Sequence, residues 1–247
     1  MRALWKLTLV QAKLYLREPV AAFFTIFYAP MMLVLFGTIY GNEPSPTFGG
    51  RGTMDISVPA YIGLIIVTVG LMSIPIGVAT RREAGVLRRF RATPLHPALY
   101  LAADVLVYFV MTLLGVTLLI LIGKVAYNVR FEGNILSVIA GFTLGTLSFF
   151  ALGYLLAGLA PTARIAQTVG MVAAFPMMFL SGATIPLEVL PETVRSAARF
   201  IPLTHVVTLV KGLWFGEGWD QHLTEVMVLA GLLLVGGAVS ARTFRWE

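Results

Sequence analysis

The sequence contains no cysteine and few charged residues. The absence of cysteine among 247 residues excludes disulfide bonds, thiolate metal sites and cysteine nucleophiles, and it leaves the redox compartment open. Charged residues make up 12% of the chain and hydrophobic residues 58%, whereas a soluble domain carries roughly 25% charged residues. So little charge cannot cover a water-facing surface of this size, and the composition therefore predicts a protein embedded in a lipid bilayer.

The motifs of nucleotide binding and hydrolysis are also missing. A P-loop needs a lysine followed by serine or threonine. The residues that follow the four lysines are Leu7, Leu14, Val125 and Gly212. The three histidines stand far apart, and neither His-Glu-x-x-His nor Gly-x-Ser-x-Gly occurs. We therefore expect no catalytic site, cofactor or metal in this chain, and no enzyme activity of its own.

Six apolar segments approach the length of about 20 residues that a membrane-spanning helix needs. They cover residues 20–39, 58–80, 99–122, 135–160, 165–182 and 223–241. A cleaved signal peptide is disfavoured for the first, because its apolar run exceeds the usual length of roughly 7–15 residues and no A-x-A site ends it. The sequence predicts an all-α polytopic membrane protein with six transmembrane helices in a single domain, residues 1–247.

Positive charge sets the predicted orientation of these helices. With the N-terminus inside, twelve of the 18 Lys and Arg residues fall in cytoplasmic segments, while most acids fall outside. By the positive-inside rule, both termini are predicted to be cytoplasmic. The net charge of +6 is therefore interpreted as a topology signal, and nucleic acid is not expected as a partner.

Residues 1–18 form a predicted amphipathic helix. Arg2, Lys6, Lys13 and Arg17 fall within about 60° of arc at a helical spacing of about 100° per residue. A narrow basic stripe on an apolar cylinder is typical of a helix that lies in the membrane interface, where membrane lipid is its partner. Ordinary positive flanking of the first span is the alternative. Glu18-Pro19 is expected to end this helix.

The segment after the second span, residues 81–97, carries five arginines and one acid. A topology signal needs only this positive charge. A short amphipathic helix that projects from the bilayer can also dock on a cytoplasmic partner, and arginine favours that use because its planar fork pairs with carboxylates.

The segment between the fifth and sixth spans is interrupted by Pro186, Pro191 and Pro202. Residues 187–201 are moderately apolar but too short and too charged to cross a membrane. Two interpretations are open: a re-entrant piece over residues 186–202 that dips into the outer leaflet, or a surface helix on the outer face.

Asp104 is the one acid inside a predicted span. An intramembrane acid is a functional candidate. Asp104, however, lies about one and a half turns from the cytoplasmic end of its helix. We favour a structural role, in which it reaches the interface or pairs with a nearby arginine.

Two of these segments together resemble the ABC-2 class of transporter permeases, including those of daunorubicin-type drug exporters. The first, RREAGVLRRFRATPLHPALYL from Arg81 to Leu101, is similar to the family's cytoplasmic loop, although it has more arginine and fewer acids than we expect. The second runs from Phe179 to Phe215 and is similar to the outer-side signature, with Ser-Gly, Pro-Leu-Glu, Leu-Pro and Pro-Leu-Thr.

The resemblance implies that the substrate path and ATP hydrolysis reside in separate subunits. Two permease chains pair around a substrate path, with a homodimer favoured over a heterodimer, and two copies of a separate ABC ATPase subunit bind ATP and Mg. The coupling helix would cover residues 81–97, and re-entrant outer helices would gate the exit. The implied ATPase-coupling residues are Arg81, Arg82, Glu83, Arg88, Arg89, Arg91, Thr93 and Pro94. The implied outer-gate residues are Ser181, Gly182, Pro186, Glu188, Pro191 and Pro202.

The function expected from this resemblance is export from a bacterial or archaeal inner membrane. The sequence reveals no charged cavity, which favours an apolar or amphipathic cargo such as a drug, a lipid or a lipid-linked glycan. Two other classes stay open: a non-transporting membrane anchor or assembly factor, and a lipid-modifying membrane enzyme.

Overall fold

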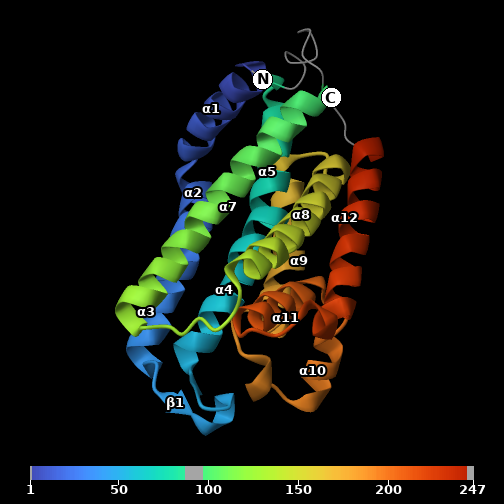
Figure 1. The fold of residues 1–247 in the computed structure, drawn as a ribbon. Helices are drawn as coiled ribbons and strands as arrows, with labels where there is room; N and C mark the ends of the chain where they lie inside the picture. The colour runs from blue at the N-terminus through green and yellow to red at the C-terminus, as the bar shows by residue number, and fades with distance from the viewer. Residues whose placement is uncertain (1, 87–96, 244–247) are drawn as a thin grey trace.

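The computed structural model describes residues 2–86 and 97–243, which are almost entirely helical (Figure 1). The helices are α1 (Arg2–Leu16), α2 (Pro19–Ile26), α3 (Tyr28–Tyr40), α4 (Thr53–Thr68), α5 (Ile74–Glu83), α7 (Pro97–Tyr127), α8 (Ile135–Leu159), α9 (Ala163–Leu180), α10 (Glu192–Ala198), α11 (Pro202–Trp214) and α12 (Leu223–Thr243). Shorter elements are the π-helix η2 (Val69–Ser73), the 3-10 turns η1 (Pro46–Phe48), η3 (Leu187–Val189) and η4 (Trp219–His222), and the antiparallel strands β1 (Pro44–Ser45) and β2 (Arg51–Gly52).

The helices form an elongated bundle with two distinct ends (Figure 1). One end, which we call the arginine end, holds α1, the last turn of α5 with Arg81, the start of α7 and the end of α12. The opposite end, the hairpin end, holds β1, β2 and α10. The first and last described helices therefore reach the same end, as the prediction of two termini on one side requires. Which end faces the cytoplasm stays a prediction.

Among the described residues, five helical stretches are long and apolar enough to cross a membrane. They are Thr53–Glu83, Leu99–Tyr127, Ile135–Leu159, Ala163–Leu180 and Trp219–Arg242. The remaining predicted span, residues 20–39, is divided at Phe27 into α2 and α3. Pro30 explains the division, because proline has no amide hydrogen for the carbonyl of Ile26 and its ring crowds that carbonyl. A sixth crossing built from two short helices stays a prediction.

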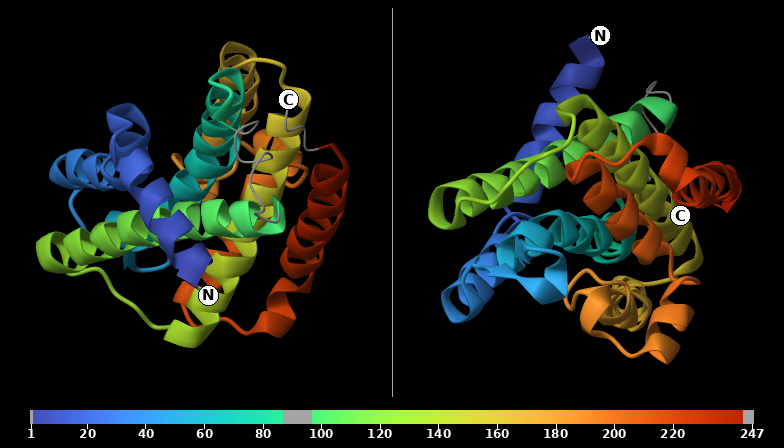
Figure 2. Two further views of the ribbon diagram at one scale, coloured as in Figure 1. Left: turned by 90° about the horizontal axis from the view of Figure 1, so that it is seen from above. Right: turned by 60° about the horizontal axis from the view of Figure 1, so that its bottom comes forward.

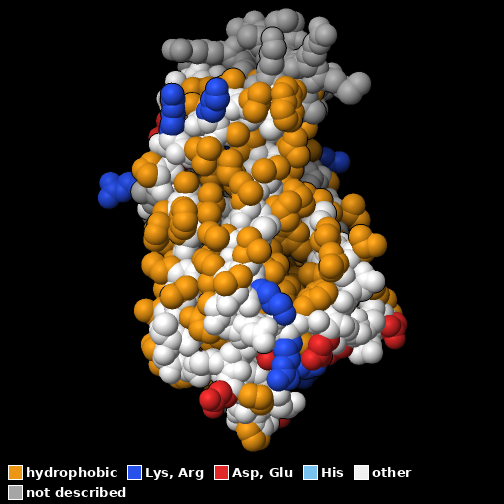
Figure 3. All heavy atoms as spheres, turned by 60° about the vertical axis from the view of Figure 1, so that its left-hand side comes forward, with side chains coloured by type: hydrophobic (Ala, Val, Ile, Leu, Met, Phe, Trp, Pro, Cys, Tyr) orange, Lys and Arg blue, Asp and Glu red, His pale blue; other side chains and the backbone are white. Residues whose placement is uncertain are grey.

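The surface of the bundle is apolar along most of its length. Figure 3 shows hydrophobic side chains over the middle of one face and charged side chains mainly towards the two ends. Leu114, Val172 and Leu234, on three different helices, are 51%, 70% and 72% exposed. An apolar surface this large is unfavourable in water and suits contact with lipid.

One helical stretch forms the core of the bundle. The elements α4, η2 and α5 run without interruption from Thr53 to Glu83, and we call this stretch the central helix. In the most apolar part of this stretch 89% of the residues are buried, whereas the corresponding share for Trp219–Arg242 is 11%. Figure 2 shows the N-terminal helices and α7 on one side of it and α8, α9 and α12 on the other. It begins and ends several residues beyond the predicted span of 58–80.

The π-helix η2 interrupts the regular hydrogen bonding of the central helix directly before Pro75. Proline cannot donate a hydrogen bond to the carbonyl of Leu71, and a widened turn accommodates that loss. Neighbouring helices approach this turn closely: a side chain on Gly153 of α8 would collide with the carbonyl of Gly70, and one on Gly170 of α9 with that of Leu71. The two glycines thus allow the backbones of α8 and α9 to pack closely against the central helix at its widened turn.

The helix α1 lies against α7 at the arginine end. Tyr15 is buried, donates to the carbonyl of Ala21 and packs edge-on against Tyr108 of α7 at 5.4 Å. Trp5 and Leu9 are exposed. The helix ends at Leu16 and the next begins at Pro19, as the Glu18-Pro19 pair predicts. Its place in the membrane interface stays a prediction.

The helix α11 was not predicted as a separate element. Its buried residues Leu203, Val206, Val207, Val210 and Leu213 recur at helical spacing, which is the signal that could have revealed it. At 13 residues it is too short to cross a membrane, so a search for spans passes over it. It packs against α4, α8 and α12 inside the hairpin end. In contrast α10, in the predicted re-entrant segment, is largely exposed, and its depth in the membrane stays a prediction.

Candidate functional site: the arginine end of the central helix

The central helix ends in three consecutive polar residues, Arg81, Arg82 and Glu83. Successive side chains on a helix point about 100° apart. Three neighbouring residues can therefore contact three different helices, and here they do.

Arg81 forms a buried ion pair with Asp104 of α7. Its Nη2 lies 3.1 Å from Oδ1 and 2.9 Å from Oδ2 of the carboxylate. The hydroxyl of Tyr154, on α8, donates to Oδ2 at 2.9 Å. Asp104 is 2% exposed. A buried ion pair is tolerated only when further hydrogen bonds satisfy its polar atoms, and Tyr154 supplies one for the carboxylate. This contact is one of the two forms that the structural interpretation of Asp104 allows, and the role itself stays a prediction.

Arg82 caps the end of α8. Its Nη1 donates to the carbonyl of Ala157 at 3.1 Å, and its Nη2 donates to the carbonyl of Ala160. The last carbonyls of a helix have no partner within the helix and carry partial negative charge. A guanidinium is well suited to both, so Arg82 fastens the central helix to α8.

Glu83 caps the start of α9. Its Oε1 accepts a hydrogen bond from the amide of Ala163 at 2.9 Å. The first amides of a helix lack partners within the helix, and a carboxylate there also meets the positive end of the helix dipole. The three residues together tie the central helix to α7, α8 and α9.

The other end of the central helix is held by Asp55, which is 1% exposed. Its carboxylate accepts hydrogen bonds from the amide of Gly52 at 3.0 Å, from Nδ2 of Asn42 at 3.1 Å and from the amide of Arg130 at 2.9 Å. It therefore joins α4 to the chain after α3 and to the link between α7 and α8. Asp55 stands before the predicted span of residues 58–80. The signal that could have revealed its position is an acid in the first turn of a helix.

The outer-gate residues lie together at the hairpin end. Ser181 is buried directly after α9, and its Oγ accepts from the amide of Ala183 at 3.3 Å. Gly182 has φ +87°, a conformation that favours glycine, and the side chain of Leu187 packs against it. Each of the three prolines stands at the start of a helix. Pro186 precedes η3, Pro191 precedes α10, and Pro202 is the first residue of α11.

A cavity of about 320 Å³ lies beside these residues. Its lining contains the charged residues Arg51, Glu188, Lys211 and Glu217 and the histidine His222. The sequence had revealed no such charged cavity. Arg51 pairs with Glu132 at 3.2 Å, Glu188 with Lys211, and His222 with Glu217 at 2.9 Å. Burial raises the pKa of Glu188, but the hydrogen bond and charge of Lys211 outweigh burial, and the net result is a pKa below the usual range.

The model of one protein family, described as ABC-2 type transporter, matches residues 2–215. This chain belongs to the ABC-2 type transporter family. The match includes the central helix with Arg81–Glu83, Asp104 and all the predicted outer-gate residues. The chain is therefore a multi-pass membrane permease of a transporter.

The chain is similar to individual proteins at low sequence identity. It is 26% identical over 194 residues to the daunorubicin resistance ABC transporter permease protein DrrB1 of Streptomyces coeruleorubidus, a match that covers 74% of this chain and 66% of that protein. It is 32% identical over 84 residues to nodulation protein J of Rhizobium leguminosarum bv. trifolii, which covers 34% and 32%. It is 25% identical over 242 residues to YvfS of Bacillus subtilis (strain 168), which covers 95% and 94%. Less than two thirds of the length of the first two relatives is covered.

The structure places the predicted site residues of the permease in two groups. Arg81, Arg82 and Glu83 lie together at the arginine end, where each has a partner within the chain. The other implied coupling residues, Arg88, Arg89, Arg91, Thr93 and Pro94, lie outside the described residues. The outer-gate residues form the second group, at the opposite end. Within the described part of the chain, no group of three or more His, Asp and Glu side chains could hold a metal ion.

Proposed function

We propose that this permease is the membrane-spanning subunit of an ATP-driven exporter. A separate ABC ATPase subunit, present in two copies, binds ATP and Mg and docks on the arginine-rich segment that begins at Arg81. A second copy of the permease completes the substrate path. The assembly moves an apolar or amphipathic compound out of the cytoplasm across a bacterial or archaeal inner membrane.

The observation that carries this proposal is the set of three contacts by which Arg81, Arg82 and Glu83 join the central helix to α7, α8 and α9. A partner that displaces the residues after Glu83 would pull on α7 through Asp104, on α8 through its last carbonyls and on α9 through its first amide. It would also push on the central helix, whose other end is fixed by Asp55 beside the hairpin end. Packed helices transmit such a displacement because close-packed interiors are stiff.

The substrate class rests on the surfaces of the permease. The exposed side chains along the bundle are mainly apolar, so a compound that enters from the bilayer meets a surface of its own polarity. Around the cavity at the hairpin end, Arg51 and Lys211 each have an acidic partner and Glu217 has a hydrogen bond with His222, which leaves few free charged groups to bind an ionic cargo. The name of DrrB1 refers to daunorubicin resistance, and a drug is the first class of compound to test.

Reconstitution with an ATPase tests the coupling role. The permease and a P-loop ATPase encoded beside its gene are placed in proteoliposomes, and ATP hydrolysis and drug export are measured. Changing Arg88, Arg89 and Arg91 to Glu is expected to abolish ATPase binding and export. The matched control changes Arg164 and Arg242 to Glu, since both are exposed at the arginine end but lie outside the segment. Binding and export that persist in the triple variant would show that coupling occurs elsewhere.

The lack of cysteine makes the predicted orientation easy to test. Ala84→Cys places a single thiol at the arginine end, and Thr47→Cys places one in the exposed hairpin. In intact cells a membrane-impermeant maleimide is expected to label Thr47→Cys and to leave Ala84→Cys unlabelled until the cells are opened. The reverse pattern would put the arginines outside and exclude docking on a cytoplasmic ATPase.

A further inference from the structure

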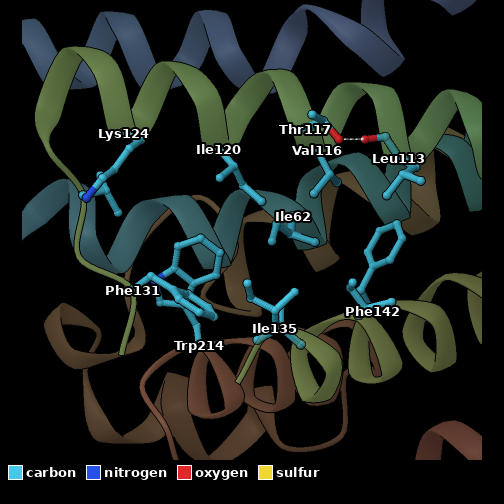
Figure 4. Close-up of a pocket in the computed structure, with 13 residues that line it drawn as sticks. Ile62, Leu113, Val116, Thr117, Ile120, Lys124, Phe131, Ile135, Phe142 and Trp214 are labelled. Carbon is cyan, nitrogen blue, oxygen red and sulfur yellow. Dashed lines mark hydrogen bonds between the residues drawn. The ribbon is translucent and has the colours of Figure 1, made fainter. Parts of the chain in front are cut away.

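A groove of about 370 Å³ runs along α7 on the side of the bundle (Figure 4). Leu113, Val116, Thr117, Ile120 and Lys124 line it from α7 at helical spacing, over about 16 Å at 1.5 Å per residue. Ile62 of the central helix and Trp214 of α11 form its buried floor, at 1% and 4% exposed. Its volume lies within the usual range for sites that hold small ligands.

The groove has one polar end. Figure 4 shows Lys124 near Phe131 and Trp214 at one end, and Leu113 and Phe142 at the other. The hydroxyl of Thr117 donates to the carbonyl of Leu113 at 2.8 Å, and Nε1 of Trp214 donates to the carbonyl of Arg130 at 2.8 Å. These polar groups are therefore satisfied by the protein. The ammonium of Lys124 is the exception, because it makes no ion pair with any residue that the structure describes.

The walls of the groove are held in place without a ligand. Phe131 packs edge-on against Trp214 with ring centroids 4.9 Å apart, and the indole hydrogen bond fixes Trp214 in turn. Two acids at the link that follows α7 already have partners: Asp55 accepts from the amide of Arg130, and Glu132 pairs with Arg51. Lys124 lies in the last turn of α7, at the hairpin end and beside the apolar groove, and it has no ion-pair partner among the described residues.

We propose that this groove binds one anionic phospholipid of the surrounding bilayer. An acyl chain lies against Ile62, Val116 and Ile120, and the phosphate pairs with Lys124. The polarity of the groove fits this occupant, because a phospholipid in the leaflet at the hairpin end also has its charge at that end and its chain towards the middle of the membrane. Ile135 and Ile139, at 65% and 50% exposed, form the rim through which the lipid enters sideways. The site requires neither the ATPase nor the transported compound.

Trp214 supplies a reporter inside the groove. Changing Trp5, Trp219 and Trp246 to Phe leaves it as the single tryptophan of the full-length permease. The protein is reconstituted in phosphatidylcholine vesicles that contain a small fraction of either brominated phosphatidylglycerol or brominated phosphatidylcholine. Bromine on an acyl chain quenches a nearby indole. We expect the phosphatidylglycerol to quench at a roughly five-fold lower fraction, since one interfacial Lys contributes about that factor.

Substitutions of Lys124 decide the result. Lys124→Gln is expected to remove the preference for phosphatidylglycerol, and Lys124→Arg to keep it. Arg199→Gln, a change of an exposed cation at the same end but outside the groove, should leave it unchanged. Equal quenching by both lipids in the parent protein would mean ordinary bilayer contact, and no quenching by either would mean that another protein chain covers the groove. Either outcome overturns the proposal, as does a preference that survives in Lys124→Gln.

Discussion

The two ends of the central helix are each held by a buried aspartate, but in different ways. At the arginine end Asp104 pairs with a charged side chain of the central helix itself, and Tyr154 completes the site. At the hairpin end Asp55 belongs to the central helix and binds only neutral donors, two of them backbone amides. The first arrangement depends on two opposite charges together. The second depends on one charge and on the path of the chain around it.

The largest effect is expected from Asp104→Ala. The substitution leaves Arg81 buried without a counter-charge, and the loss of one partner of a buried pair typically costs about 3–5 kcal/mol. Thermal unfolding of the purified permease in detergent measures this loss. The double variant Arg81→Met with Asp104→Leu removes both charges and should recover most of the stability. If the double variant is as unstable as the single one, the aspartate acts through something other than its pairing with Arg81.

A smaller loss is expected from Asp55→Ala. It leaves the amides of Gly52 and Arg130 without their acceptor. One unsatisfied buried donor typically costs about 1–3 kcal/mol, and of these two residues only Gly52 is buried, while water can reach the exposed Arg130. No second substitution can compensate, because backbone amides cannot be removed by mutation of their side chains. In the Asp55→Ala variant the lower melting temperature should be accompanied by faster hydrogen exchange at the amides of Gly52 and Arg130 than in the wild type. Unchanged exchange at those amides would contradict the role given to Asp55.

The smallest effect is expected from Glu188→Gln, which breaks the pair with Lys211 beside the cavity. Both side chains are partly exposed, at 38% and 22%, and pairs of this kind contribute at most about 1 kcal/mol. Glu192→Gln, an exposed acid on α10, is the matched control.

The same pair predicts a dependence on pH. The pKa of Glu188 lies below the ordinary value of about 4.3, so its contribution is present above that value and is lost as the pH falls through the lower folded-state pKa. The difference in Tm between the wild type and Glu188→Gln should therefore begin to shrink as the pH falls below the ordinary value and should disappear once the pH is below the folded-state pKa. A difference that persists in acid would mean that Glu188 acts without its charge.

The sequence predicted the pairing of Asp104 as one possibility, but it could not name the partner. Five arginines lie within a few residues of one another in segment 81–97, and all are close to Asp104 along the chain. Only the packing of α5 against α7 and α8 selects Arg81. The roles of Arg82 and Glu83 were equally hidden, because their partners are backbone atoms that any sequence would supply.

Hydrophobicity predicted the long helices well, since membrane-spanning stretches need length and apolar character above all. Hydrophobicity did not predict the elements that are too short to cross the membrane by themselves. The helix α11 is buried by neighbouring protein and is only 13 residues long, and α2 and α3 are separated by the backbone requirements of Pro30. Asp55 stands outside the predicted span of residues 58–80, although here it lies in the first turn of the helix.

The widened turn at Val69–Ser73 holds one residue more than the regular turn that it replaces, so the segment beyond it keeps nearly the orientation of an uninterrupted helix. The stretch from this turn to Arg81 is regular helix and cannot absorb a change of length in the same way. One residue added or removed there would rotate the segment after it by about 100° around its axis. Arg81 would then face away from Asp104, and the two neighbouring caps on α8 and α9 would lose their alignment at the same time. The length of α5 is thus constrained as tightly as its composition.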